Sequence, residues 1–257
     1  MTPHYDDGQM QVWHGDCRDV LPLIKRESVS LVVTSPPYNI GKLYADYHDR
    51  ADGYLDFVTD AINAASETIK GDGAVWVNTG YRTTERGNVP IAFEVQPRVS
   101  LYLMQHVVWE YGAGMTYASR FNHRSEDWLW FVSDPERYCF NGDAVRDRSL
   151  TVYRQDKRNN PKGKLPGTVW YFPHVAGTHS EREDHPAQFP ETMIRRIVLA
   201  CSNEGDVILD PFMGSGTTLR VAKDLGRRGI GIDVSKAYCA GVVRRLQQAV
   251  LQLDISA

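Results

Sequence analysis

The stretch DVILDPFMGSGTT (206–218) decides the fold of this protein. Its apolar run ends at Asp210, a glycine-rich turn follows, and a helical pattern begins after the turn. In a parallel sheet this order places a ligand above the carboxyl end of the strand, and Gly214 and Gly216 let the backbone approach it closely. No lysine follows the second glycine, which excludes a P-loop, and Leu219 stands where a dinucleotide fingerprint has its third glycine. Helix–strand packing alone would also explain such a turn.

Short apolar segments recur on both sides of this stretch, with helical patterns between several of them. The predicted strands are 9–15, 28–34, 73–79, 105–112, 127–133, 206–211 and 228–233, and the predicted helices are 52–70, 190–202 and 234–253. Pro190 is expected at the first helical position of its helix, and Ser235 is expected to cap the last one. Strands that alternate with helices predict an α/β fold: a Rossmann-like, mostly parallel twisted sheet with helices on both faces. The segments 105–112 and 127–133 are predicted to form an antiparallel hairpin at its edge.

Two acidic residues follow short apolar runs and could bind a nucleoside. Asp233 ends RGIGID about twenty residues after the glycine turn, where Rossmann-like folds have an acid that accepts hydrogen bonds from ribose hydroxyls. Asp16, in HGDCRDVL, could accept a hydrogen bond from an exocyclic amine. The alternatives are a helix cap for Asp233 and an ordinary surface turn for Asp16.

The segment TSPPYN (34–39) ends another apolar run with two prolines and an aromatic ring. Two successive prolines exclude both strand pairing and helix at that point. Taken alone, the segment is better explained as a rigid loop without chemistry.

The composition is that of a globular protein with a full core: 42% hydrophobic and 24% charged residues over 257 positions. A net charge of −3 requires that any nucleic-acid binding depend on a local basic patch. The four cysteines form no CxxC pair, which argues against a zinc site or a disulfide scaffold, and no metal is expected. Neither a signal sequence nor a membrane span is predicted, so the expected location is cytoplasmic.

The segment 134–184 interrupts this pattern, because it has few periodic apolar positions and many Gly, Pro, Asn, Arg and Lys residues. Between positions 145 and 165 seven basic residues stand against two acidic ones. So long a stretch without regular structure is typical of a functional loop, a small inserted module or a disordered tract. A solvated charged loop is the simpler alternative.

Together these motifs resemble the β group of the amino-group DNA methyltransferases, which methylate an exocyclic nitrogen with S-adenosylmethionine. The resemblance covers 14–133 and 185–240. The catalytic tetrapeptide matches Ser35–Tyr38, and the cofactor motif FxGxG matches Phe212–Gly216, with DP before it and TT behind it. The segment from position 185 resembles the HPxxKP helix of the family, but Phe189 replaces its lysine, which removes the expected charged contact to the methionine carboxylate from that position.

The resemblance implies roles for individual residues. Ser35 Oγ and the Pro36 carbonyl accept hydrogen bonds from the target amine, the two prolines hold that carbonyl outward, and Tyr38 stacks on a flipped base. The implied catalytic residues are Ser35, Pro36, Pro37 and Tyr38. The implied cofactor-binding residues are Asp16, Cys17, Asp210, Pro211, Phe212, Gly214, Ser215, Gly216, Thr217, Thr218 and Asp233. The two threonines either bind the methionine carboxylate or cap the helix.

The resemblance also implies two domains: a catalytic domain, 1–133 and 185–257, and a target-recognition region, 134–184, that binds phosphates and base edges. The expected DNA-binding residues are Asn39, His123, Arg146, Arg148, Arg154, Lys157, Arg158, Lys162 and Lys164. His123 and Glu126 lie where the family has a substrate-side motif, although an ordinary loop histidine explains His123 as well.

The expected partner is double-stranded DNA, and the preferred target is cytosine N4, because SPPY is associated with it whereas DPPY is commoner among adenine-N6 enzymes. Adenine N6 stays the alternative. An RNA methyltransferase fits the long basic insertion less well, and a non-catalytic DNA-binding module would be expected to lack the intact motifs. The sequence leaves open the recognition site, a homodimer and an accompanying restriction endonuclease.

Overall fold

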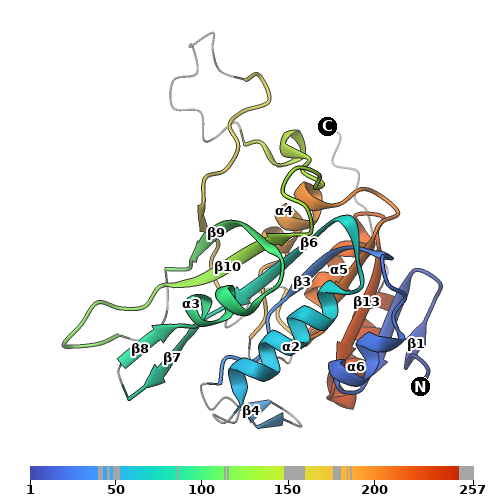
Figure 1. Cartoon of the computed structure of the whole chain (residues 1–257), viewed down its shortest axis with the longest axis horizontal. Helices are drawn as coiled ribbons and strands as arrows, with labels where there is room; N and C mark the ends of the chain where they lie inside the picture. The colour runs from blue at the N-terminus through green and yellow to red at the C-terminus, as the bar shows by residue number, and fades with distance from the viewer. Residues whose placement is uncertain are drawn as a thin grey trace.

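The computed structural model describes residues 1–248 apart from 40–42, 45–46, 49–52, 86, 113, 115, 148–159, 176–180, 184 and 186. In these ranges one sheet of nine strands forms the centre of the molecule (Figure 1). Its order is β1 (Tyr5–Asp6), β2 (Met10–His14), β13 (Arg228–Asp233), β12 (Val207–Asp210), β3 (Val29–Thr34), β6 (Ile69–Thr79), β10 (Ser125–Val132), β9 (Tyr102–Glu110) and β11 (Val169–Tyr171). Two small hairpins accompany it, β4 (Leu43–Tyr44) with β5 (Tyr47–His48) and β7 (Tyr81–Thr84) with β8 (Gly87–Pro90).

The sheet is mostly parallel, as the sequence predicts. Each neighbouring pair from β2 to β6 is parallel, and β10 is antiparallel to both β6 and β9. Because parallel strands end at one side, β2, β13, β12, β3 and β6 share what we call the carboxyl edge of the sheet. The opposite side, where these strands begin, is the amino edge.

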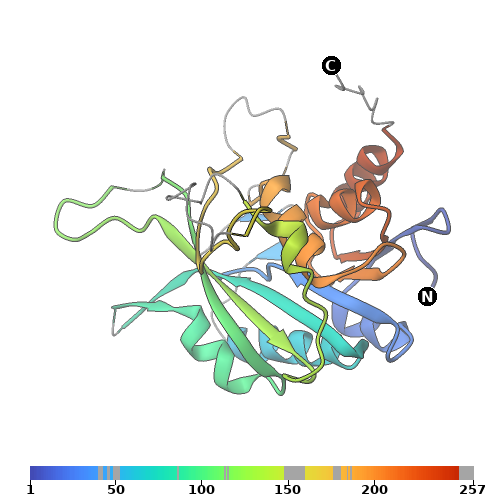
Figure 2. The ribbon, with the colours of Figure 1, turned by 90° about the horizontal axis from the view of Figure 1, so that it is seen from above.

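Helices cover both faces of the sheet (Figure 2). They are α1 (Cys17–Val20), α2 (Tyr54–Ser66), α3 (Ile91–Val95), α4 (Glu191–Cys201), α5 (Thr217–Asp224) and α6 (Lys236–Gln247), with the 3₁₀ turns η1 (Leu21–Leu23), η2 (Gln96–Arg98) and η3 (Gly142–Val145). Along β3, Leu31 and Val33 pack with α4, α5 and α6, whereas Val32 packs with α1, α2 and α3. Burial on both faces explains why three successive residues of β3, Leu31–Val33, are apolar.

Several features differ from the predictions. The helix predicted over 52–70 ends at Ser66, because Ile69 pairs with Val29 and begins β6. Pro190 is the N-cap of α4, one position before its first residue, and the described part of the last helix ends at Gln247. The predicted hairpin of β9 and β10 is present, but it is not at the edge. β11, from within 134–184, pairs with β9 and covers it.

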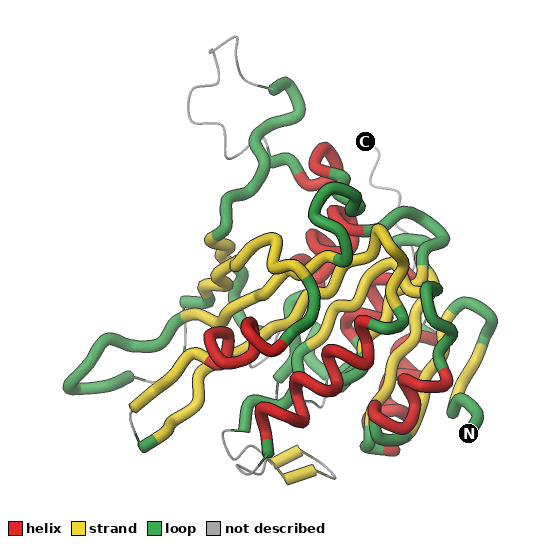
Figure 3. Tube along the Cα trace, viewed as in Figure 1, coloured by secondary structure: helices red, strands yellow, loops and turns green. Residues whose placement is uncertain are grey.

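Figure 3 shows the β4–β5 hairpin beside the amino end of α2, at the carboxyl edge. Among the described residues, no helix combines the length and the apolar character that crossing a membrane requires.

Candidate active site

A cavity of about 430 Å³ lies at the carboxyl edge, within the size range of small-molecule and cofactor sites. Segments from distant parts of the chain line it. They include Gly15–Arg18 before and in α1, Ser35, Pro37 and Tyr38 after β3, Gly53, Tyr54 and Phe57 around the start of α2, and Asp233–Ser235 after β13. Most of the glycine loop, 210–218, completes the wall, Gly216 excepted. The structure therefore brings TSPPYN (34–39), which we call the proline segment, and the glycine loop to one cavity.

The glycine loop requires glycine at both of its glycine positions. Gly214 has a φ of 50° and Gly216 a φ of 73°, which are left-handed conformations that side chains disfavour. A Cβ on Gly214 would lie 2.7 Å from Nε2 of His185, and a Cβ on Gly216 would lie 2.7 Å from a methyl group of Val242. The loop thus packs closely on one side while its other side faces the cavity.

Asp233 holds this loop in place. One carboxylate oxygen accepts a hydrogen bond from the Gly214 N–H at 2.9 Å, and the other accepts from the Ser235 N–H at 2.8 Å. Ser235 is the N-cap of α6, as predicted, and accepts from the Tyr238 N–H at 3.4 Å. Asp233 lines the cavity and holds the loop, but the N-cap of α6 is Ser235, so the alternative of a helix cap at Asp233 is wrong.

A hydrogen bond joins the proline segment and the glycine loop at their strand ends: Thr34 Oγ1 donates to Asp210 Oδ1 at 2.8 Å. The Phe212 N–H donates to the same oxygen at 3.1 Å. Burial raises the pKa of Asp210 to about 6, and the negative charge of Asp233 acts in the same direction. The hydrogen bonds from its neighbours lower that pKa without cancelling the effect of burial.

We expect Asp210 to make stability depend on pH. Its pKa is higher in the folded protein (about 6) than its ordinary value of 3.8, so its stabilising contribution is complete below about pH 4 and is lost as pH rises through 6. The loss amounts to roughly 3 kcal/mol, at 1.36 kcal/mol per pKa unit. Urea unfolding between pH 4 and 7 measures it. Asp210→Asn should abolish this part of the pH dependence, and the exposed Asp60→Asn is the matched control. An unchanged pH dependence in Asp210→Asn would contradict the assignment.

The proline segment is tied to β6 and β10 by hydrogen bonds. Ser35 Oγ donates to the Tyr38 hydroxyl at 3.1 Å and lies 3.4 Å from Asn78 Oδ1. The Tyr38 hydroxyl also binds Asn78 Oδ1 and lies 3.0 Å from Glu126 Oε2. The Tyr38 ring is buried and packs on Gly80, where a Cβ would lie 2.8 Å from the ring. Tyr38 therefore forms a fixed wall of the cavity.

Two other residues predicted to act here do not line the cavity. Pro36 and Asn39 are not among the cavity-lining residues, and Asn39 has a φ of 55° as the chain leaves the corner. Sequence reasoning missed Asn78 and Gly80, whose sole signal is a polar residue and a glycine at the end of a buried strand.

Asp16 and Cys17 line the cavity near α1. Asp16 is the N-cap of that helix and pairs with Arg18 at 2.6 Å, and the hydrogen bond from Arg18 holds the pKa of Asp16 below its usual value. Burial raises the pKa of the Cys17 thiol to about 12. The arrangement therefore offers a charged carboxylate and a neutral thiol.

Aromatic side chains complete the wall, among them Phe57 and Tyr238, which the sequence did not single out. The rings of Phe57 and Phe212 meet edge to face at 5.7 Å, and those of His185 and Tyr238 at 4.8 Å. Phe189, at the position of the family's lysine, is buried and apolar. Over the described ranges, no group of three or more His, Cys, Asp or Glu side chains is arranged to hold a metal ion.

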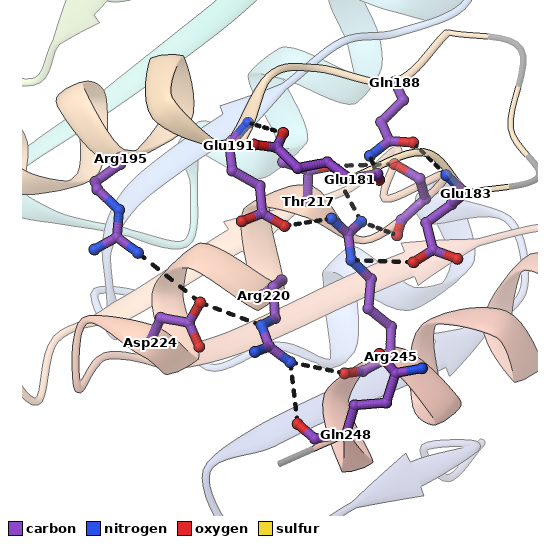
Figure 4. Close-up of polar contacts among 11 residues, drawn as sticks. Glu181, Glu183, Gln188, Glu191, Arg195, Thr217, Arg220, Asp224, Arg245 and Gln248 are labelled. Atoms are coloured by element: carbon purple, nitrogen blue, oxygen red, sulfur yellow. Dashed lines mark hydrogen bonds and ion pairs between the residues drawn. The ribbon is translucent and has the colours of Figure 1, made fainter. Parts of the chain in front are cut away.

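A buried arginine lies beneath the glycine loop (Figure 4). Arg245 of α6 is 5% exposed. Its Nη1 donates to the Ser215 carbonyl at 2.8 Å and lies 3.3 Å from Thr217 Oγ1. Its Nη2 donates to Glu191 Oε1 at 2.6 Å, and its Nε lies 3.6 Å from Glu183 Oε1. One side chain thus joins α6, the glycine loop, α4 and the residues before α4 around Glu183.

The segment before α4 is held by a second set of hydrogen bonds. The Glu191 N–H donates to Glu181 Oε2 at 3.0 Å, and the Glu183 N–H donates to Gln188 Oε1 at 2.8 Å. Sequence reasoning missed Arg245, because an arginine pair in an amphipathic helix gives no signal that one of its members is buried.

Within the segment 134–184, the part around Asn141 lies at the amino edge, opposite the cavity, whereas Glu183 contacts Arg245 near the glycine loop. The Asn141 N–H donates to the Ala200 carbonyl near the end of α4, where the chain turns to begin β12. Arg146 and Lys162 both pair with Asp143, at 2.8 and 2.7 Å, and Lys164 pairs through its backbone with Asp147. The predicted DNA-binding residues Arg148, Arg154, Lys157 and Arg158 lie outside the described residues. His123 lies at the carboxyl edge, 4.5 Å from Tyr81 between ring centres.

Comparisons with known proteins agree with this geometry. A model of the N6_N4_Mtase family, described as DNA methylase, matches residues 29–244. The Type II methyltransferase M.ScaI of Streptomyces caespitosus is 38% identical, covering 95% of this chain and 84% of the relative. The DNA adenine methyltransferase YhdJ of Escherichia coli (strain K12) is 36% identical, covering 92% and 82%.

Solved structures show the same fold. The PvuII DNA methyltransferase (cytosine-N4-specific) matches with a TM-score of 0.75 at 19% identity, covering 97% of this chain and 90% of that one. The M1.HpyAVI–SAM complex matches with a TM-score of 0.66 at 22% identity, covering 93% and 100%.

Proposed function

Because this chain belongs to the N6/N4 DNA methylase family and is a DNA amino-methyltransferase, we propose that it methylates the N4 amine of cytosine in double-stranded DNA. The observation that carries the proposal is the single cavity that the proline segment and the glycine loop both line. A methyl donor and an acceptor amine that occupy one cavity can be aligned for direct transfer, and alignment is where most of the rate is expected to arise.

The cavity suits S-adenosylmethionine. Its wall combines the backbone of Gly214, which carries no Cβ, two carboxylates at Asp16 and Asp233, and the aromatic rings of Phe57 and Phe212. The carboxylates would accept hydrogen bonds from ribose hydroxyls and an adenine amine, and the rings would pack on the base. When bound, S-adenosylmethionine supplies a methyl group on a positively charged sulfur.

The proline segment would bind the target amine. The lone pair of an exocyclic amine is delocalised into the ring of its base, so the nitrogen is a poor nucleophile. Ser35 Oγ and the Pro36 carbonyl, as acceptors for its N–H groups, would return electron density to the nitrogen. Asn78 and Glu126 support this role because they fix Tyr38, the hydrogen-bond partner of Ser35. The target base must leave the helix to reach this position.

Cytosine is proposed because a neutral hydroxyl, Ser35, stands at the first position of the tetrapeptide. Adenine N6 is the second candidate, and the observation in its favour is the 36% identical relative named DNA adenine methyltransferase. We also propose 134–184 as the target-recognition region, on the strength of the seven basic residues that stand against two acidic ones between positions 145 and 165.

Nucleoside mass spectrometry distinguishes the two products. Unmethylated genomic DNA incubated with the protein and S-adenosylmethionine is expected to contain N4-methylcytosine after digestion. N6-methyladenine instead would establish the second candidate. Absence of both products, on DNA that contains every short recognition site, would overturn the proposed activity.

A further inference from the structure

A loop at the carboxyl edge carries aromatic and basic side chains and has no acidic residue. We call Thr116–Arg124, with the sequence TYASRFNHR, the aromatic–basic loop. It joins β9 to β10 and projects, together with the β7–β8 hairpin, from one side of the molecule (Figure 1). Phe121 near its tip is 99% exposed.

The loop has internal contacts that account for its shape. The Tyr117 N–H donates to Asn122 Oδ1 at 2.7 Å, and the Arg120 guanidinium lies 4.0 Å from the centre of the Tyr117 ring. His123 packs on Tyr81 of the neighbouring hairpin. These contacts hold the chain on both sides of Phe121 and leave its ring in solvent.

The loop is directly connected to the proline segment. It leads into Ser125 and Glu126 at the start of β10, and Glu126 Oε2 lies 3.0 Å from the Tyr38 hydroxyl. Phe121 is therefore five positions along the chain from a residue that contacts the site proposed to bind the target base. Arg146 and Lys162 of the segment 134–184, by contrast, lie near the amino edge, where both pair with Asp143.

Resting on the proposed function, we propose that the aromatic–basic loop is a DNA-contact surface, in which Arg120 binds a phosphate and Phe121 packs against bases beside the extruded nucleotide. Removal of a base from the helix leaves a gap in the stack and exposes the faces of its neighbours. An apolar ring can cover such faces, and inserted apolar side chains are a recurring device of DNA-binding proteins. An exposed arginine beside the ring complements the phosphate charge, and the loop offers no acid to oppose it.

The test is equilibrium binding to a duplex that the wild-type protein methylates, measured by fluorescence anisotropy over a series of salt concentrations. Phe121→Ala is expected to weaken binding at least about fivefold, as expected for loss of one stacking contact, and Phe121→Trp to retain it. Arg120→Gln is expected to reduce the slope of log K against log salt by about 0.9, the value for one phosphate contact. The matched control is Lys25→Gln, an exposed lysine just before β3 at the amino edge, which should leave that slope unchanged.

The possible failures are distinguishable. If the wild-type protein neither methylates nor binds DNA, the proposed function itself fails. If it does both, and Phe121→Ala and Arg120→Gln bind as the wild type does, the inference about the loop is overturned. It is equally overturned if Arg120→Gln leaves the slope unchanged while Lys25→Gln lowers it, or if the loop variants change only self-association in sedimentation. Affinity for S-adenosylmethionine, measured by calorimetry, should be unchanged in both loop variants and confirms that they are folded.

Discussion

Arg245→Gln is expected to lower the free energy of unfolding by about 3 kcal/mol and to weaken binding of S-adenosylmethionine. The guanidinium is 5% exposed, and it compensates the charges of Glu183 and Glu191 while holding the Ser215 carbonyl. Removal of one partner from a buried ionic network leaves the others uncompensated. The effect should lie at the lower end of the range for buried pairs, because the two glutamates remain partly accessible to water. Urea unfolding at pH 7 measures the loss.

The neighbouring Arg244 is the matched control, since it is an exposed arginine in the same helix. Arg244→Gln should change stability by less than about 0.5 kcal/mol. Equal effects of the two substitutions would show that Arg245 contributes no more than a surface charge. A second readout separates the loop from the rest of the network, because loosening of Ser215 should lower cofactor affinity even at low temperature, where the variant is fully folded.

Ser35→Ala is expected to lower the rate of methylation at least about tenfold while cofactor affinity stays the same. The substitution removes one proposed acceptor for the amine and leaves the glycine loop untouched. Tyr38→Ala should lower the rate by at least as much, because it removes the ring that lines the cavity and releases Asn78 and Glu126. Single-turnover rates with saturating cofactor measure both effects.

Asp233→Ala is expected to lower cofactor affinity, which Ser35→Ala leaves unchanged. Loss of its carboxylate removes the bonds to the Gly214 and Ser235 N–H groups, so cofactor affinity by calorimetry should fall. Unchanged affinity in Asp233→Ala would place the ribose elsewhere. A Tyr38→Ala variant that methylates at the wild-type rate would remove base stacking from the mechanism.

Much of the fold could be predicted from local patterns. Apolar runs with helical segments between them predicted the parallel sheet, and the strand–turn–helix at 206–218 predicted β12, the loop and α5. The glycine positions were predictable for a steric reason: left-handed φ values at Gly214 and Gly216 exclude most side chains whatever the surroundings. The end of α2 was not, because Ile69 fits a helical period as well as a strand, and its pairing with Val29 is a long-range contact.

The sequence by itself determined which chemistry-bearing segments exist: the order of the proline segment and the glycine loop, and the strands that precede them. Such features depend on neighbouring residues and are therefore legible along the chain. The tertiary structure alone decided that Asn78 holds Tyr38 and that Arg245 and not Arg244 is buried beneath the loop. It also decided that Arg146 and Lys162 lie opposite the cavity. Each of these depends on which residues distant in sequence become neighbours in space, and hydrophobic periodicity carries no information about that.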